Sequence, residues 1–345
     1  MYGQKLNHPV KDTELVEKVF AANGANFNRI ALEVFQFQYA NNLVYKKYCD
    51  TIKTDITAVK SVAQIPFLPI NFFKTHTVTG GSFEPEAVFE SSGTTQTINS
   101  RHFVKDVSLY EKSFTKAFEL FYGKAEEWCI IALLPSYLER KNSSLVMMAD
   151  KLIQQSRHPQ SGFYLNEFNK LKSVLSELEH AKQKTLLIGV TFGLLDFAGQ
   201  FPSDGYREPL PNTIIMETGG MKGRRKEMTR AQVHGILCKA FQKENIHSEY
   251  GMTELLSQAY SQGKGIFNCP PWMKILIREE DDPFAVHEAN NTTINGAINI
   301  IDLANIYSCS FIAAEDAGKL HADGSFEVMG RLDNTDIRGC SLMAL

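Results

Sequence analysis

A turn of small hydroxylated residues is the most visible candidate for chemistry in this sequence. The stretch Ser91-Ser92-Gly93-Thr94-Thr95 directly follows the apolar run Ala87-Val88-Phe89, which we interpret as a strand. The backbone amides and hydroxyls of such a turn can converge on phosphate oxygens, so the stretch predicts an anion site. It lacks the Gly-Lys-Ser/Thr triplet of a Walker loop. Taken alone, it fits a surface turn equally well.

A second candidate is the stretch Glu249-Tyr250-Gly251-Met252-Thr253-Glu254, which follows a short apolar segment. The ring of Tyr250 can stack on a purine, and the hydroxyl of Thr253 can reach a phosphate. The carboxylate of Glu254 can hold a Mg²⁺ ion that bridges phosphate oxygens. The alternative is a strand end with an exposed tyrosine and a solvated glutamate.

Three further positions extend this constellation. Gly219 and Gly220 begin a glycine-rich, basic stretch after the predicted strand Thr213 to Met216, at the edge where ligands of open α/β sheets bind. Asp316 can accept hydrogen bonds from both ribose hydroxyls, and Arg331 can add a cation to that clamp. Each of these stretches has a simpler interpretation as a solvated loop or turn.

Histidines are weighed separately, because a lone histidine is more often structural than catalytic. His102 follows the Ser-Gly-Thr turn closely, and we expect it to orient a phosphate or a substrate carboxylate. His76 and His247 are interpreted as structural residues.

The elements that must position these residues alternate along the chain. Residues 1–65 have helical periodicity, and Pro66 and Pro69 interrupt it. From about residue 86, short apolar runs alternate with amphipathic helices, which predicts βαβ units and an α/β fold with a mostly parallel sheet. Asp106 and Thr229 are expected to cap two of the helices. The expected strands after the first are Cys129 to Leu134, Thr185 to Val190, Thr213 to Met216, Met273 to Ile277, Ile298 to Ile301 and Phe326 to Val328.

Composition narrows the function classes. The chain has 345 residues, 43% of them hydrophobic and 22% charged, with a net charge of −3, so nothing favours nucleic acid as a partner. The six cysteines show no Cys-x-x-Cys spacing, which favours a reducing, cytoplasmic location. Residues 1–10 lack a basic segment followed by an apolar run, and no stretch approaches the roughly 20 apolar residues that span a bilayer, so we expect neither a signal segment nor a membrane span.

In this order, the motifs resemble the successive signatures of the adenylate-forming superfamily of acyl-CoA synthetases and related ligases. They are Ser-Ser-Gly-Thr-Thr at 91–95, Gly-Gly at 219–220, Tyr-Gly-Met-Thr-Glu at 250–254, Glu-Asp at 315–316 and Gly-Arg-Leu-Asp at 330–333. More narrowly, the chain is similar to the LuxE-type acyl-protein synthetases. The segments that carry this likeness are 65–73 (IPFLPINFF), 100–102, 134–145 (LPSYLERKNSSL), 219–225 and 338–342 (RGCSL).

The resemblance implies a reaction in which a carboxylic acid, a fatty acid in this family, is activated by ATP to an acyl-adenylate. Pyrophosphate leaves, and the acyl group then passes to a thiol. The implied roles are phosphate binding for Ser91, Ser92, Gly93, Thr94 and Thr95, adenine binding for Gly219, Gly220 and Tyr250, contact with the α-phosphate and Mg²⁺ for Thr253 and Glu254, and ribose binding for Asp316 and Arg331.

The resemblance also implies the architecture. Residues 1–330 would form the large α/β domain of adenylate-forming enzymes, with parallel-rich sheets flanked by helices and a small β-rich part. Residues 331–345 would form a short tail in place of the usual mobile C-terminal domain. Cys340 lies in this tail where LuxE-type proteins have the cysteine that accepts the acyl group. A cation such as Arg338 would help to activate its thiol.

Departures from the superfamily pattern keep other functions open. Gln96 and Glu315 both stand where glycine is usual, and the lysine expected after the phosphate turn is absent. One alternative is a ligase that transfers the acyl group to coenzyme A or a carrier protein. Another is a nucleotide-binding protein without catalysis. An acyl-accepting protein or a reductase would be partners compatible with the resemblance, and homo-oligomerisation stays open.

Overall fold

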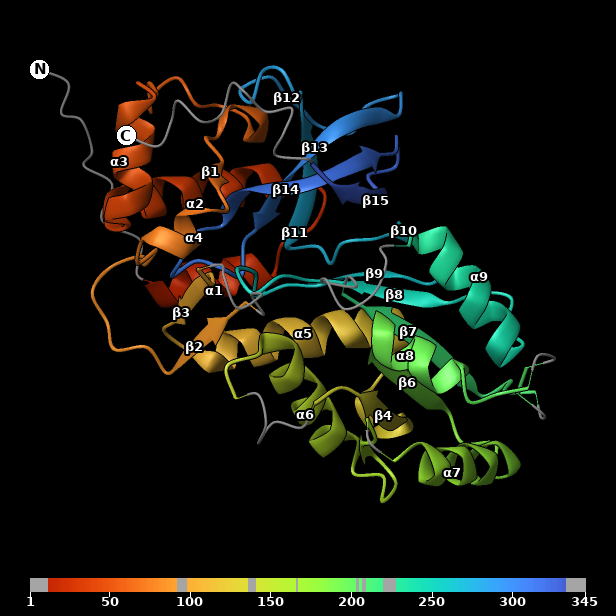
Figure 1. Ribbon diagram of the computed structural model, residues 1–345. Helices are drawn as coiled ribbons and strands as arrows, with labels where there is room; N and C mark the ends of the chain where they lie inside the picture. The colour runs from red at the N-terminus through yellow and green to blue at the C-terminus, as the bar shows by residue number, and fades with distance from the viewer. Residues whose placement is uncertain are drawn as a thin grey trace, which may run out of the picture.

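Two large β-sheets organise the molecule, and helices pack against both of them (Figure 1). The structure is a computed structural model that describes residues 12–91, 98–135, 141–165, 167–202, 205–206, 209–219 and 228–332. One sheet is mostly parallel and the other mostly antiparallel, so the chain has the α/β fold that the alternating sequence pattern predicts.

The parallel sheet has the strand order β5-β4-β6-β7-β8-β9, and only β9 runs antiparallel to its neighbour. Every residue of β4 is buried, as expected for a central parallel strand that is covered on both faces. The expected strand Thr185 to Val190 coincides with β6. The bounds are β4 Cys129–Leu133, β5 Gly162–Phe163, β6 Thr185–Val190, β7 Thr213–Thr218, β8 His247–Tyr250 and β9 Ala259–Ser261.

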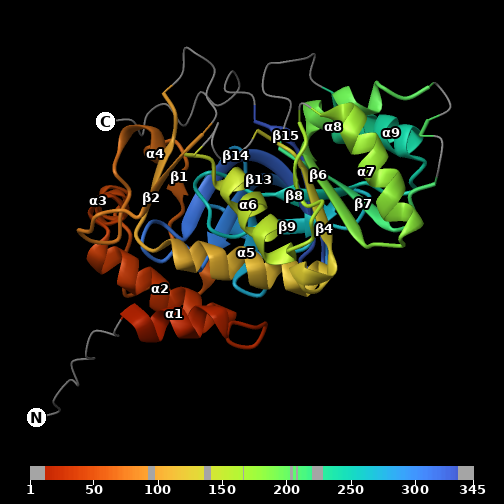
Figure 2. The ribbon, with the colours of Figure 1, turned by 90° about the horizontal axis from the view of Figure 1, so that it is seen from below.

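Helices cover both faces of this sheet (Figure 2). On one face, α5 and α6 bury Phe114 and Met148 in the core that the two sheets share. On the other face, α7, α8 and α9 bury Leu171, Phe197 and Leu237 in a second core. The bounds are α5 Val107–Tyr122, η2 Ala125–Glu127, α6 Ser144–Ser156, α7 Phe168–His180, α8 Thr191–Ala198 and α9 Arg230–Phe241.

The two predicted helix caps are confirmed. The Asp106 side chain accepts a hydrogen bond from the Ser108 amide at the start of α5. Thr229 forms a capping box with Gln232 at the start of α9, in which each side chain bonds the other residue's amide. These caps fix where α5 and α9 begin relative to the sheet.

The antiparallel sheet has the order β10-β15-β14-β13-β11-β12, and β1 pairs in parallel with β14. The expected strands at 298–301 and 326–328 lie within β13 and β15. Both strands extend well beyond those apolar runs, so the β-rich part is larger than the sequence pattern suggested. The bounds are β1 Leu68–Pro69, β10 Ile266–Phe267, β11 Met273–Arg278, β12 Val286–His287, β13 Ile294–Asp302, β14 Phe311–Leu320 and β15 Phe326–Arg331.

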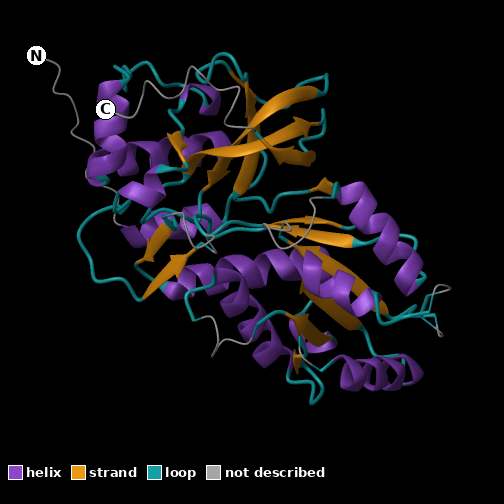
Figure 3. Ribbon diagram, viewed as in Figure 1, coloured by secondary structure: helices purple, strands orange, loops and turns teal. Residues whose placement is uncertain are grey.

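The N-terminal helices pack against this antiparallel sheet (Figure 3). Gln38, buried in α2, donates hydrogen bonds to the carbonyls of Asn305 and Ile306, each at 3.0 Å, and so ties the helices to the segment between β13 and β14. No helix in the described part of the chain is long and apolar enough to span a membrane. The bounds are α1 Asp12–Phe20, α2 Phe27–Asn41, α3 Leu43–Thr51, η1 Val62–Gln64 and α4 Phe72–Thr75.

Candidate active site

The strands β2 (Ala87–Glu90) and β3 (Arg101–Val104) form a hairpin that frames the predicted phosphate turn. Beyond the paired strands, the Ser91 amide donates to the Ser100 carbonyl at 3.1 Å, and the Ser100 amide donates to Ser91 Oγ at 2.9 Å. Ser92, Gly93, Thr94 and Thr95 lie outside the described residues. The structure therefore defines the base of the turn.

Three of the predicted nucleotide-binding residues meet although they are distant in sequence. Tyr250, at the end of β8, donates a hydrogen bond from its hydroxyl to Asp316 Oδ2 at 3.0 Å. Asp316 in β14 lies directly opposite Arg331 in β15 in the strand register. Burial raises the pKa of Asp316, and the Tyr250 hydrogen bond and the Arg331 charge oppose this only in part. Arg331 itself is exposed.

The Tyr250 ring lies in an aromatic cluster. It is 8% exposed and makes edge-on contacts with Phe267 and Phe326, with ring centroids 5.9 and 5.5 Å apart. Burial is also the main cause that raises the pKa of Tyr250, so the phenol keeps its proton and remains a hydrogen-bond donor. The Tyr250 ring is therefore held in place by its packing, beside the Asp316 carboxylate.

Gly251 follows Tyr250 at a point where the backbone passes close to a buried acid. A Cβ atom at this position would overlap the carboxylate of Glu249. A larger residue here would therefore require the Glu249 carboxylate to move, a constraint that the sequence motif alone does not reveal.

Thr253 and Glu254 complete the turn after β8. Thr253 is half-buried, and Glu254 is 5% exposed. Their main-chain carbonyls both accept hydrogen bonds: that of Thr253 from His102, and that of Glu254 from Asn305 at 2.7 Å. The described residues contain no group of three or more His, Cys, Asp and Glu side chains that could hold a metal ion.

His102 lies inside the molecule rather than at an open surface. It is 1% exposed, and its Nδ1 and Nε2 atoms lie 2.9 Å from the Thr253 carbonyl and 3.0 Å from Asn305 Oδ1. Both partners are acceptors, so only a doubly protonated ring could donate to both. Burial lowers the pKa of His102 to about 4. At neutral pH the ring is therefore neutral and donates to one of the two oxygens at a time.

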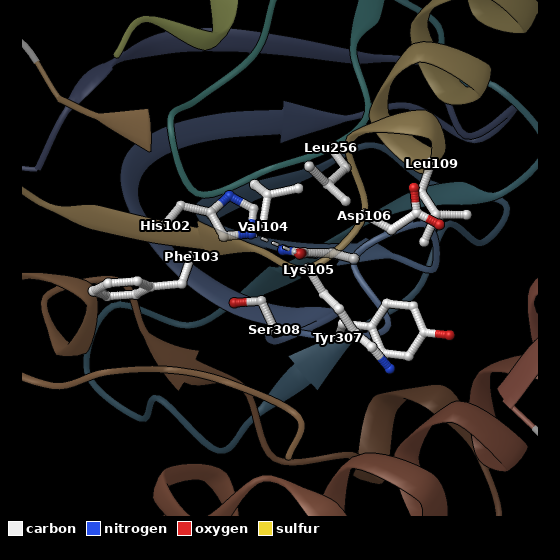
Figure 4. A pocket seen from close by; sticks show the side chains of 10 residues that line it. His102, Phe103, Val104, Lys105, Asp106, Leu109, Leu256, Tyr307 and Ser308 are labelled. Carbon is white, nitrogen blue, oxygen red and sulfur yellow. Dashed lines mark hydrogen bonds between the residues drawn. The ribbon is translucent and has the colours of Figure 1, made fainter. Parts of the chain in front are cut away.

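A small cavity adjoins this histidine (Figure 4). Its volume is about 10 Å³, and His102, Leu256, Asn305 and Ser308 are among the residues that line it. A cavity of this size has room for about one water molecule. It is too small to hold a nucleotide.

Gly219, directly after β7, lies at the carboxyl end of the parallel sheet. Gly219 has a φ of +75°, and a Cβ there would meet nothing within 4 Å. Its carbonyl accepts a 2.6 Å hydrogen bond from the hydroxyl of Thr191, at the start of α8. Gly220 and Cys340 lie outside the described residues.

Sequence reasoning missed a cation near the Tyr250–Asp316 pair. Arg230, the first residue of α9, donates from Nε to Glu217 at 3.3 Å and from Nη1 to the Val328 carbonyl at 2.9 Å. Its guanidinium carbon lies 5.0 Å from the centroid of the Phe267 ring. Its charge also lowers the pKa of Asp316, though less than the nearer causes do. In sequence, Arg230 is only a helix-start residue after Thr229, and no motif marks it.

Asn305 was missed as well. It is fully buried and follows β13, and its amide contacts residues from two distant segments. A lone asparagine in a segment without a motif carries no signal of such a role.

Comparison with known proteins identifies the family. The family model described as "Acyl-protein synthetase, LuxE" matches residues 10–344. Among solved structures, 2-hydroxyisobutyryl-CoA ligase in complex with 2-HIB-AMP superposes with a TM-score of 0.60 at 9% identity, over 96% of this chain and 72% of that one. ATP-bound MatB from Rhodopseudomonas palustris superposes with a TM-score of 0.53 at 13% identity, over 73% of this chain.

The chain covers 49% of MatB, about half of its length. At these identities the likeness is one of fold. No curated protein sequence matches the chain significantly. Because the family model spans nearly the whole chain, the protein belongs to the LuxE acyl-protein synthetase family, and its fold is that of adenylate-forming enzymes.

Proposed function

We propose that this protein uses ATP to activate a carboxylic acid, specifically a fatty acid, and then transfers the acyl group to the thiol of Cys340. The observation that carries the proposal is the meeting of Tyr250, Asp316 and Arg331 beside the carboxyl end of the parallel sheet. Family membership supports the acyl-adenylate step. The destination of the acyl group rests on the resemblance of the residues around Cys340.

In the first step, a carboxylate oxygen of the acid attacks the α-phosphorus of ATP. A new oxygen–phosphorus bond forms, the bond to the β-phosphate oxygen breaks, and pyrophosphate leaves. Asp316 would accept hydrogen bonds from the ribose hydroxyls, and the aromatic ring of Tyr250 would lie beside the adenine. Donors fixed in advance stabilise the charge that develops on the phosphate.

Thr253 and Glu254 fit a Mg²⁺ ion by their chemistry, because both supply oxygen atoms. Magnesium is commonly held by one or two carboxylates together with substrate phosphates. Glu254 would be the carboxylate ligand, and Thr253 would contact the α-phosphate. When bound, the ion would offset negative charge on the phosphate oxygens.

In the second step, the Cys340 thiolate would attack the acyl carbon of the adenylate. A carbon–sulfur bond forms, AMP leaves, and the thiol proton passes to solvent. The product is a thioester on the protein, from which an acyl-accepting protein or a reductase would take the acyl group. We also propose a cytoplasmic location, because the cysteines within the described residues are free thiols.

Pyrophosphate release and acyl labelling together test the proposal. Pyrophosphate should be released from ATP only when a carboxylic acid is present, in a panel of acids of increasing length. A radioactive acid should leave a label that survives denaturing electrophoresis and is removed by hydroxylamine, as a thioester is.

The Cys340→Ser variant separates the two steps. It should exchange pyrophosphate into ATP like the wild type but retain no thioester label. A persistent label would refute Cys340 as the acceptor, and multiple turnover with coenzyme A would favour the external-thiol alternative. Tight ATP binding without exchange for any acid would favour a non-catalytic protein.

A further inference from the structure

One buried histidine connects two segments that carry the predicted site. His102 belongs to β3, one strand of the hairpin that frames residues 92–97. Through its ring it reaches the carbonyl of Thr253, which lies 151 residues away in the chain. The rings of Phe73 and Phe89 make edge-on contacts with the imidazole, with centroids 5.9 and 6.4 Å away. The His102 ring thus lies between the β2–β3 hairpin and the turn after β8 that contains Thr253.

Asn305 fixes the other side of this contact. Its Nδ2 atom donates to the carbonyls of Glu254 at 2.7 Å and Cys309 at 2.9 Å. The reverse amide orientation would place Oδ1 against two carbonyl oxygens, so Oδ1 must face His102. Gln38 holds the Asn305 carbonyl at 3.0 Å, which ties the group to α2.

These bonds leave His102 without a ring nitrogen that points toward a substrate. Its Nδ1 atom faces the carbonyl oxygen of Thr253, and its Nε2 atom faces Oδ1 of Asn305. The same two residues, His102 and Asn305, contact consecutive carbonyls of the turn after β8, those of Thr253 and Glu254. The side chains of Thr253 and Glu254 project from the backbone that these bonds fix.

We propose that His102 and Asn305 are positioning residues, which set the place of Thr253 and Glu254 relative to the β2–β3 hairpin without touching substrate. This inference rests on the proposed function for its catalytic consequence. Its structural core, the coupling of the hairpin to the turn, can be measured without any reaction. Misplacing a catalytic group by about 1 Å can lower a rate on the order of 100-fold.

The test compares His102→Gln and Asn305→Asp with His247→Gln as the matched control. Asn305→Asp keeps the shape and the acceptor toward His102 but removes both donated hydrogen bonds. His247 is a partly buried histidine of β8, whose ring bonds the Tyr122 hydroxyl at 3.2 Å, and burial likewise lowers its pKa to about 4.

Amide hydrogen exchange of the folded, ligand-free proteins is the first measurement. Both site variants should exchange at least tenfold faster in 252–257 and in 98–104, while 185–190 in β6 keeps the wild-type rate. The control should leave 252–257 and 98–104 unchanged. Wild-type exchange in these two segments in either site variant would overturn the proposal.

Acid-dependent pyrophosphate release is the second measurement. The kcat of His102→Gln should fall by about 10- to 100-fold with a nearly unchanged KM for the acid, because binding is kept and alignment is lost. A KM effect with wild-type kcat would contradict a positioning role. If the wild type releases no pyrophosphate with any acid, the proposed function fails, and the exchange data alone decide the coupling.

Discussion

Glu249 is a buried carboxylic acid in the strand β8. It is 8% exposed and accepts a hydrogen bond from the hydroxyl of Thr218 on the neighbouring strand. In the strand register it lies opposite Tyr260 of β9. The Tyr260 hydroxyl and Gln258 Oε1 are buried without a hydrogen-bond partner among the described residues. Burial raises the pKa of Glu249 to about 7, so the acid is partly protonated at neutral pH.

The Glu249→Gln variant should change how stability depends on pH. The folded protein binds the Glu249 proton more tightly than the unfolded chain does. The stabilising contribution of this proton is therefore fully present below pH 4.5 and is lost as the pH rises through about 7. Glutamine keeps a hydrogen bond to Thr218 and cannot ionise. Relative to the wild type, the variant should gain roughly 2 to 3 kcal/mol of unfolding free energy between pH 5 and pH 8.

Urea unfolding at the two pH values measures this difference. Glu244→Asp, at an exposed position, provides a control. Its unfolding free energy should differ from that of the wild type by the same amount at both pH values. An equal effect of Glu249→Gln at pH 5 and pH 8 would show that the carboxyl does not titrate in this range.

At the scale of single residues, the sequence predicted those candidate site residues that belong to short motifs. Tyr250 and Asp316 belong to motifs, and the structure brings them within hydrogen-bonding distance. Asn305 and Arg230 could not be predicted, because their partners come from other segments and depend on how the two sheets pack. The alternative interpretation of the stretch 249–254, a strand end with an exposed tyrosine, is wrong, because the Tyr250 ring is mostly buried against phenylalanines.

At the scale of elements, local rules were sufficient for caps and for buried parallel strands. Asp106 and Thr229 begin their helices as predicted, because a cap depends only on the next few residues. The bounds of β6 follow from a continuous apolar run. In contrast, β13 and β14 also pair through Asn295, Gly296 and Lys319, so part of that ladder lies outside any apolar pattern. Sequence alone also does not specify the order of the antiparallel strands.

The cap of α9 should be worth a measurable amount of stability. Thr229→Ala removes the side chain that accepts a hydrogen bond from the Gln232 amide at 3.3 Å, and it should lower the unfolding free energy by about 1 kcal/mol. Thr229→Ser keeps the hydroxyl and should lie within a few tenths of the wild type. Equal losses in the two variants, by urea unfolding, would show that the methyl group rather than the cap matters.

At the scale of the whole molecule, the two sheets share one hydrophobic core and are also linked by a polar connection. Arg230 bonds Glu217 of the parallel sheet and the Val328 carbonyl of the antiparallel sheet. Burial alone would raise the pKa of Glu217, but the His234 hydrogen bond and the Arg230 charge outweigh it and hold the pKa below its ordinary value. Glu217 is therefore a buried anion that depends on its partners.

Removing Arg230 should leave this anion undercompensated. Losing one partner of a fully buried pair costs about 3–5 kcal/mol, but the Arg230 side chain is 27% exposed, so we expect Arg230→Gln to lower the unfolding free energy by roughly 2 kcal/mol. Adding Glu217→Gln should restore part of the loss, because no charge then remains buried. Lys170→Gln at the exposed Lys170–Glu167 pair should change stability by less than about 1 kcal/mol. A double-mutant cycle with zero coupling between Arg230 and Glu217 would show that this ion pair does not stabilise the packing of the two sheets.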